Sequence, residues 1–167
     1  MHPEISLRAP EPYDIDRIYL WENSTDELHT TLRTGPLSRH QIEDFVLNYD
    51  GELYTRGALR FMIDADGETV GTIDIFDYDH RARHAFVGIF IAPAYRRRHI
   101  GSQALKLIER HVYRAVGMYS VAAIVAEDNE ASRALFTTAG YTAAGILRGW
   151  LVDGMRRVDA ILFEHLL

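Results

Sequence analysis

The stretch Ile89–Leu105, IFIAPAYRRRHIGSQAL, decides how the rest of this chain is interpreted. It starts as an apolar run, continues through a turn with one proline and three consecutive arginines, and ends in an amphipathic segment that opens with Gly-Ser. When a strand leads through a short basic loop into a helix, backbone N–H groups and guanidinium groups point at one place. The stretch therefore predicts an anion-binding site that suits a pyrophosphate.

The basic loop resembles the motif with which GNAT acetyltransferases wrap the pyrophosphate of acetyl-coenzyme A, Arg/Gln-x-x-Gly-x-Gly/Ala at the start of a helix. Its positions are occupied by Arg96, Arg97, Arg98, His99, Ile100 and Gly101, and Ser102 follows. His99 stands where the family usually has glycine, and a residue with a Cβ resists positive φ angles, although histidine is enriched among the exceptions. Neither a P-loop string nor GxGxxG occurs in the chain, so coenzyme A fits best.

The composition is that of a globular protein. At 167 residues, with 47% hydrophobic and 25% charged residues, the chain predicts one domain over 1–167. It has neither a membrane-spanning apolar run nor an apolar signal core, which predicts a cytoplasmic protein without membrane attachment. The absence of cysteine excludes a thiolate nucleophile and a Cys-ligated zinc site. A net charge of -6 argues against a general nucleic-acid surface and is compatible with a cationic amine substrate.

Apolar periodicity and turn signals predict the secondary structure. A capping box at Ser38 and Gln41 starts one helix, and Asp-Gly pairs at Asp66 and Asp153 indicate hairpin turns. The expected strands are Ile5–Ala9, Leu59–Asp64, Thr69–Tyr78, Ala85–Ile91, Tyr119–Val125, Tyr141–Trp150 and Met155–Phe163. The expected helices are Asp14–Glu22, one from Ser38, Gly101–Val116 and Asn129–Ala139, with Ala104, Leu107, Ile108, His111 and Val112 on one face of the third.

This order of strands and helices resembles the GNAT fold over nearly the whole chain. The resemblance implies an α/β (α+β) domain with a mixed, mostly antiparallel central sheet, flanked by helices and splayed at its central strands. Within the family the chain is most similar to the branch of spermidine and ribosomal-protein N-acetyltransferases. Beside the basic loop, the segments that carry this similarity are VGTIDIFDYDHRARHA (70–85), DNEASRALFTTAGY (128–141) and GWLVDGMRRVDAILF (149–163).

The resemblance also implies further contacts with the cofactor. The central strand at Ile89, Phe90 and Ile91 would hold the pantetheine, and one of its backbone N–H groups would stabilise the oxyanion. Asn129 would contact the pantetheine arm and Ser132 would lie near the phosphates, although an N-cap role is sufficient to explain Asn129.

The family's usual general acid is missing. Phe136 occupies the position of the tyrosine that often protonates the departing thiolate, and a phenyl ring cannot donate a proton. Water, another hydroxyl or unassisted departure of the thiolate must replace it, because a thiol of pKa roughly 8.5 is a tolerable leaving group.

Acidic residues are the candidates for the general base, which must deprotonate an ammonium of pKa about 10. Asp74 and Asp77 match acidic positions of the spermidine acetyltransferase pattern, and regular strand alternation lets only one of them face the site. Glu22 lies in the region that covers the acceptor in this family. The aromatic residues Trp21, Tyr78 and Trp150 could wall the acceptor pocket, and Asp77 could bind the substrate, although core packing or a solvated turn explains them as well. The histidines are mostly scattered, and the one HxxxH string, His80–His84, falls in a predicted turn, so no metal site is predicted.

We therefore predict an acetyl-coenzyme A-dependent N-acetyltransferase that acts by direct transfer to a polyamine, a small amine or a peptide N-terminus. The alternative is a non-catalytic acyl-coenzyme A-binding or sensory module of the same fold, for which Phe136 is the motivating observation. The C-terminal hairpin, which ends in the apolar string ILFEHLL, could pair with a second subunit to form a homodimer.

Overall fold

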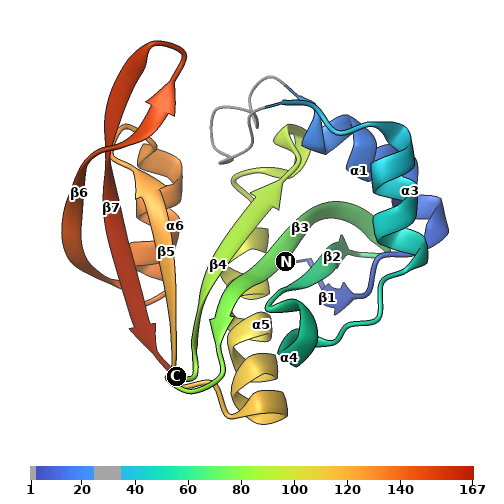
Figure 1. Ribbon diagram of the computed structural model, residues 1–167, viewed down its shortest axis with the longest axis horizontal. Helices are drawn as coiled ribbons and strands as arrows, with labels where there is room; N and C mark the ends of the chain where they lie inside the picture. The colour runs from blue at the N-terminus through green and yellow to red at the C-terminus, as the bar shows by residue number, and fades with distance from the viewer. Residues whose placement is uncertain (1–2, 25–34) are drawn as a thin grey trace.

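The computed structural model describes residues 3–24 and 35–167, whose strands form one seven-stranded sheet in the order β1-β2-β3-β4-β5-β7-β6 (Figure 1). The strands are β1 (Ile5–Arg8), β2 (Leu59–Ala65), β3 (Glu68–Asp79), β4 (His84–Ile91), β5 (Ser120–Ala126), β6 (Thr142–Asp153) and β7 (Arg156–Leu166). The helices are α1 (Ile15–Glu22), α3 (Arg39–Leu47), α4 (Leu53–Arg56), α5 (Ile100–Val116) and α6 (Glu130–Thr138), with 3-10 turns η1 (Pro12–Asp14) and η2 (Pro93–Tyr95). The predicted fold class is confirmed.

The sheet is antiparallel except between β4 and β5, which run parallel. Their pairing covers only residues 84–86 of β4 and 120–122 of β5, after which the two strands separate. Figure 1 shows the two strands diverging from their shared end, with β5, β7 and β6 on one side of the opening and β1–β4 on the other. The predicted splay of the central strands is therefore confirmed.

Local chemistry places the turns and helix ends. Asp66 and Gly67 have φ angles of 51° and 84°, the conformation that a two-residue type I′ hairpin requires and that an Asp-Gly pair favours. The Ser38 side chain accepts a hydrogen bond from the Gln41 N–H, and the Gln41 side chain accepts one from the Ser38 N–H. This reciprocal capping box starts α3 as predicted.

The core lies on both faces of the sheet. Helices α5 and α6 lie behind the strands in Figure 1, and the apolar stripe of α5 packs there against β2–β5. A second cluster, Ile18, Ile42, Val46 and Met62, is buried where α1 and α3 pack against β2. The helices on both faces hold the central strands in place while their far ends remain apart.

Several details differ from the prediction. On α5 the buried face carries Leu105, whereas His111 is exposed and packs edge-on against Phe61 of β2. Leu107 and His111 instead line a shallow groove beside β1. The last hairpin turns at 154–155 rather than at 153–154, and the one-turn helix α4 was missed.

Nothing in the described part of the chain forms a helix that is long and apolar enough to cross a membrane.

Candidate active site

The separation of β4 from β5 opens a cleft of about 450 Å³ in the middle of the sheet. It is continuous from the split strands to the helix α1 that covers β2 and β3. The residues that line it are Ile18, Trp21, Glu22, Arg60, Thr72, Asp74, Phe76, Val87–Phe90, Ala123–Ala126, Asn129, Ser132, Phe136, Trp150 and Leu151. A cleft at a break in the hydrogen-bonded sheet exposes backbone donors that a continuous sheet would use internally.

The far half of β4 supplies these donors. Because β4 pairs with β3 along 84–91 but with β5 only along 84–86, alternate N–H groups of 87–91 point toward the opening. Gly71 of β3 lets the two strands approach closely, since a Cβ at this position would lie 2.1 Å from the Phe90 carbonyl oxygen. Ile89 and Phe90 line the cleft, whereas Ile91 does not.

The basic loop between β4 and α5 has the backbone of an anion cradle. Arg97 and His99 have φ angles of 62° and 60°, so two non-glycine residues adopt the left-handed conformation just before the 17-residue helix. The Ser102 hydroxyl donates to the His99 carbonyl oxygen at 3.0 Å and closes the turn. The first N–H groups of a helix have no intrahelical acceptor, and alternating backbone handedness gathers further N–H groups into a concave nest. The loop therefore fits a pyrophosphate, and His99 takes the conformation that glycine would take.

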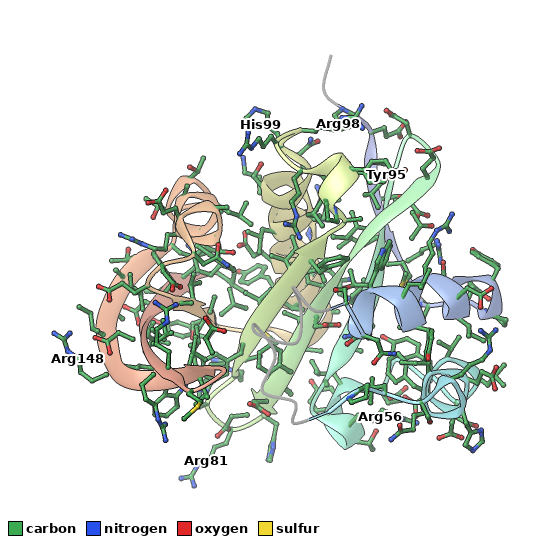
Figure 2. The ribbon with its side chains drawn as sticks, turned by 90° about the horizontal axis from the view of Figure 1, so that it is seen from above. Arg56, Arg81, Tyr95, Arg98, His99 and Arg148 are labelled. Carbon is green, nitrogen blue, oxygen red and sulfur yellow. The ribbon has the colours of Figure 1, made fainter. Side chains whose placement is uncertain are left out.

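The arginines of the loop point in different directions. The Arg96 Nε donates to the Ile91 carbonyl oxygen at 2.8 Å, and its guanidinium lies 6.0 Å from the Phe90 ring, so this side chain turns back onto β4. Arg98 lies over the Tyr95 ring, and Figure 2 shows both beside His99 at one end of the molecule. Arg97 is exposed. None of the residues 96–102 lines the cleft itself; the loop follows β4 at the end where the cleft opens.

Helix α6 borders the other side of the cleft. The Asn129 side-chain oxygen accepts a hydrogen bond from the Ser132 N–H at 3.0 Å, and both residues line the cleft. Asn129 is thus an N-cap and also a cleft residue, so the two interpretations of its presence are compatible. Phe136 lines the cleft but is 4% exposed and packs against Tyr141 and Phe163. It forms an apolar wall there.

The opposite end of the cleft contains a charged cluster. Arg60 donates from Nε and Nη2 to the two carboxylate oxygens of Asp74 at 2.7 and 2.8 Å, and from Nη1 to Glu22 at 2.5 Å. Burial alone would lower the pKa of Arg60, but the charges of Asp74 and Glu22 and their hydrogen bonds raise it, so the guanidinium stays charged. Trp21, which precedes Glu22 in α1, and Trp150 of β6 also line the cleft.

Sequence reasoning missed Arg60, although a signal was present. Arg60 interrupts an apolar strand, and β2 and β3 form a predicted hairpin in which it lies directly opposite Asp74. Counting outward from the Asp-Gly turn pairs Arg60 with Ile73, one residue from Asp74, and the register shift between Ile63 and Asp64 then moves Arg60 opposite Asp74.

Asp77 and Tyr78, which were expected to contact the acceptor, do not line the cleft. A register shift follows Phe76, and Asp77 is exposed with a φ angle of 51°. The Tyr78 ring packs edge-on against Tyr54 of α4, 5.8 Å away between ring centroids. The strand-end bulge therefore turns both residues away, and only Asp74 of this strand's acidic residues faces the cleft.

The described residues of the cleft include no tyrosine, histidine or lysine. The hydroxyl groups that line it belong to Thr72 and Ser132. In the described part of the chain, no group of three or more histidine, aspartate or glutamate side chains could hold a metal ion.

Comparisons with known proteins agree with this architecture. The family model for the acetyltransferase (GNAT) domain matches residues 4–142. The spermidine N(1)-acetyltransferase of Escherichia coli (strain K12) is 21% identical over 164 residues, which cover 96% of this chain and 87% of that protein. The structure of spermidine N-acetyltransferase from Vibrio cholerae in complex with CoA and spermine has a TM-score of 0.83 at 19% identity and covers 97% of this chain and 95% of its own.

A ribosomal-protein alpha-N-acetyltransferase (RimL) in complex with coenzyme A has a TM-score of 0.84 at 18% identity, covering 98% of this chain and 94% of its own. At these identities the solved structures establish the fold. The family match covers most of the chain, so the protein belongs to the GNAT acetyltransferases. This family match identifies the protein as an acetyltransferase of the acetyl-coenzyme A-dependent N-acetyltransferase class.

Proposed function

We propose that the chain transfers an acetyl group from acetyl-coenzyme A directly to a primary amine inside the cleft between β4 and β5. One observation carries this proposal: a single cavity joins the split strands and the N-terminus of α6 to the Glu22–Arg60–Asp74 cluster. Thioester and amine can therefore meet without a covalent enzyme intermediate, for which the described cleft offers no cysteine or lysine.

The cofactor would be held from two sides. Arg97, Arg98 and the N–H groups at the start of α5 would bind the pyrophosphate, because charge-assisted hydrogen bonds and a helix N-terminus favour an anion. The backbone of Ile89 and Phe90 would bind the pantetheine arm, with Asn129 and Ser132 opposite. Arg96 would then fasten the loop to β4 through the Ile91 carbonyl rather than bind phosphate.

Acetyl transfer requires that a proton be removed from the amine and that the negative charge developing on the oxyanion be stabilised. The cofactor supplies the acetyl group as a thioester, and only a neutral amine can attack it. N–H groups of β4 that point into the opening would stabilise the oxyanion. Asp74 or Glu22 would accept the amine proton directly or through water, since a carboxylate oxygen has two lone pairs and can accept a second hydrogen bond beside that from Arg60.

The departing thiolate would take its proton from water or from the Ser132 hydroxyl, because Phe136 cannot supply one. Phe136 also motivates the second candidate, a module that binds acyl-coenzyme A without turning it over. Release of free thiol from acetyl-coenzyme A, measured with a panel of primary amines, tests both. Amine-dependent release supports the transferase, whereas tight cofactor binding with no release above the uncatalysed rate would support the binding module.

We also propose that the last hairpin mediates a homodimer. Ile146, Trp150, Val152 and Met155 are at least half exposed on β6 and its turn, and β6 is an edge strand. An exposed apolar edge favours pairing with another chain. Light scattering on the parent and on a Val152→Lys, Met155→Lys double variant tests this, with a monomeric parent as the contradicting result. The cytoplasmic location stays a prediction.

A further inference from the structure

Two threonines of β3 are equally buried but differ in what their hydroxyls bind. Thr69 and Thr72 are both 7% exposed. The Arg8 Nη2 donates a hydrogen bond to the Thr69 hydroxyl at 2.8 Å, which explains a polar side chain at that position. Among the described residues, the hydroxyl of Thr72 has no hydrogen-bond partner. The packing of the protein therefore gives no reason for an oxygen at this position.

The Thr72 hydroxyl faces the cleft. Three buried side-chain oxygens have no hydrogen-bond partner within the part of the chain that the structure describes, and they are Asp64 Oδ1, Glu109 Oε1 and the Tyr141 hydroxyl. Thr72 Oγ1 is not among these buried atoms although it also has no partner, so it keeps contact with open space. Because Thr72 lines the cleft, that space is the cleft.

The neighbours of Thr72 in the sheet are apolar. Met62 of β2 and Phe90 of β4 lie directly opposite it, and Met62 is fully buried. A valine has nearly the same shape as threonine and would pack there without removing a hydroxyl from water, which costs free energy when no partner replaces the water. The Thr72 hydroxyl therefore indicates a polar partner that enters the cleft.

The strand register places Thr72 beside the groups that react in the proposed transfer. Thr72 and Asp74 both line the cleft. Residues i and i+2 of a strand point to the same face and lie about 6–7 Å apart, and one water that bonds to two oxygens bridges about 5–6 Å. Phe90, opposite Thr72, belongs to the part of β4 whose N–H groups would stabilise the oxyanion. A water on the Thr72 hydroxyl would thus lie between the attacking amine and Asp74.

We infer that Thr72 positions the water through which the proton of the acceptor amine reaches Asp74, at the acceptor end of the cleft. This inference rests on the proposed acetyl transfer and adds a residue to its proton route. The water takes a proton from the ammonium and gives one of its own to an Asp74 carboxylate oxygen, while its remaining hydrogen bonds to Thr72 Oγ1. The step leaves a neutral amine, an unchanged water and a protonated Asp74. Arg60 holds the carboxylate in place with hydrogen bonds of 2.7 and 2.8 Å.

The test removes the hydroxyl and keeps the shape of the side chain. Thiol release is measured for Thr72→Val and the parent between about pH 6 and pH 10, with whichever of spermidine, 2-phenylethylamine and a short peptide the parent acetylates fastest. We expect kcat to fall by about tenfold to a hundredfold at about pH 7, while KM for the amine and the affinity for acetyl-coenzyme A change by less than about twofold. The deficit should shrink toward about pH 10, where the free amine is neutral and needs no proton acceptor.

Three further variants separate this role from packing. Thr72→Ser keeps a hydroxyl and should recover most of the rate. Thr72→Ala removes the hydroxyl without adding bulk, so it should show the same pH-dependent deficit, and it provides the test if the valine variant does not fold. Thr69→Val is the matched control, because it makes the same substitution on the same strand away from the cleft. It should lower the free energy of unfolding through the lost bond with Arg8 and leave the pH dependence of kcat unchanged.

Two outcomes would overturn this inference and leave the transferase intact. One is a parental kcat in the folded variants that lack the Thr72 hydroxyl, and the other is a deficit that stays equal at every pH, which would mean that Thr72 acts through packing. Cofactor binding by calorimetry without thiol release from the parent for any amine would instead overturn the proposed function, and this inference with it.

Discussion

The conformation of single residues decides whether the basic loop can bind a pyrophosphate. Arg97 and His99 both have positive φ angles, which cost a residue with a Cβ about 1 kcal/mol or more relative to glycine. The loop keeps this geometry although the sequence lacks the expected glycine. Of the neighbouring arginines, Arg96 turns toward β4, while Arg97 and Arg98 remain available to a phosphate.

Replacing Arg97 and Arg98 together by glutamine should weaken acetyl-coenzyme A binding by roughly tenfold for each charge-assisted hydrogen bond that the substitutions remove. The effect should shrink as salt is raised, because salt screens exposed charges. Calorimetric titration at two salt concentrations measures both changes. The control is Arg81→Gln, since Arg81 lies at the opposite end of the molecule from His99 (Figure 2). Equal affinity of the double variant and the parent would remove the loop from the cofactor site.

His99→Gly should leave cofactor affinity unchanged or improve it, because glycine adopts the same backbone without strain. His99→Val should destabilise the protein by about 1–2 kcal/mol, since a β-branched residue tolerates positive φ least. Urea unfolding and cofactor titration of both variants provide the comparison. A large drop in affinity in the glycine variant would mean that the imidazole itself contacts the cofactor.

Asp74→Asn should lower kcat/KM for the amine by about 10²-fold, the order expected when a positioned proton acceptor or ammonium anchor is removed. Affinity for acetyl-coenzyme A should not change. Rates measured against pH for the parent, Asp74→Asn and Glu22→Gln show which carboxylate shapes the profile, and Asp50→Asn serves as an exposed control. Identical profiles for Asp74→Asn and the parent would leave Glu22 or a water chain as the proton route.

At the scale of elements, the function depends on how closely β3 approaches β4 and how far β5 departs from it. Gly71 allows β3 to approach β4 closely, because any Cβ at this position would overlap the Phe90 carbonyl. The short β4–β5 ladder allows β5 to depart from β4 and leaves backbone donors facing the cleft. Helix α6 then adds Asn129 and Phe136 along the open side.

Gly71→Ala should destabilise the protein by about 1–3 kcal/mol, the usual cost of forcing extra volume into a packed site. It should also lower turnover in the fraction that remains folded, because the strand that carries Phe90 must shift. Gly145→Ala is the control, since a Cβ there meets nothing within 4 Å. Thermal unfolding and thiol release are measured on both variants, and equal stability of Gly71→Ala and the parent would contradict the close approach.

At the scale of the whole molecule, two buried carboxyl groups among the described residues lie outside the cleft, Asp14, which pairs with Arg8, and Glu109. Glu109 of α5 is 9% exposed, and among the described residues its Oε1 has no hydrogen-bond partner, as is true of the neighbouring Tyr141 hydroxyl. Burial raises the pKa of Glu109, opposed in part by Tyr141 and His165. The folded chain therefore holds this proton at a pH where the unfolded chain has released it, and folding stability falls as pH rises from the unfolded pKa through the raised folded pKa.

Glu109→Gln should remove the loss of folding stability that the buried carboxyl group causes as pH rises. We expect a gain of about 1–3 kcal/mol at about pH 7.5, well above the pKa of this carboxyl group in the unfolded chain, and little difference at about pH 4. Urea unfolding at the two pH values gives the difference between variant and parent. Glu164→Gln, an exposed change on β7, should leave stability unaltered at both. An equal gain in the free energy of unfolding at both pH values would mean that the substitution acts through packing and not through the titration of Glu109.

Local sequence information determined the order of the elements and the position of the anion loop. Caps such as Ser38, the Asp66-Gly67 turn and the apolar periodicities act within a few residues, so they can be recognised without knowledge of the fold. Asn129 and Phe136, which were singled out through a motif whose parts are close in sequence, both line the cleft, and their contact with the cofactor stays a prediction.

Only the tertiary structure decided what the acceptor end of the cleft contains. Arg60 meets Glu22 and Asp74 because α1 packs over β2 and β2 pairs with β3, and the bulge after Phe76 turns Asp77 and Tyr78 away. Likewise the periodicity of α5 placed Leu107 and His111 on one face with Ile108, but only the contacts of the folded helix decide that Ile108 is buried while Leu107 and His111 line a groove beside β1. Strand register, bulges and helix rotation are set by contacts between distant segments, and a pattern within one segment does not contain them.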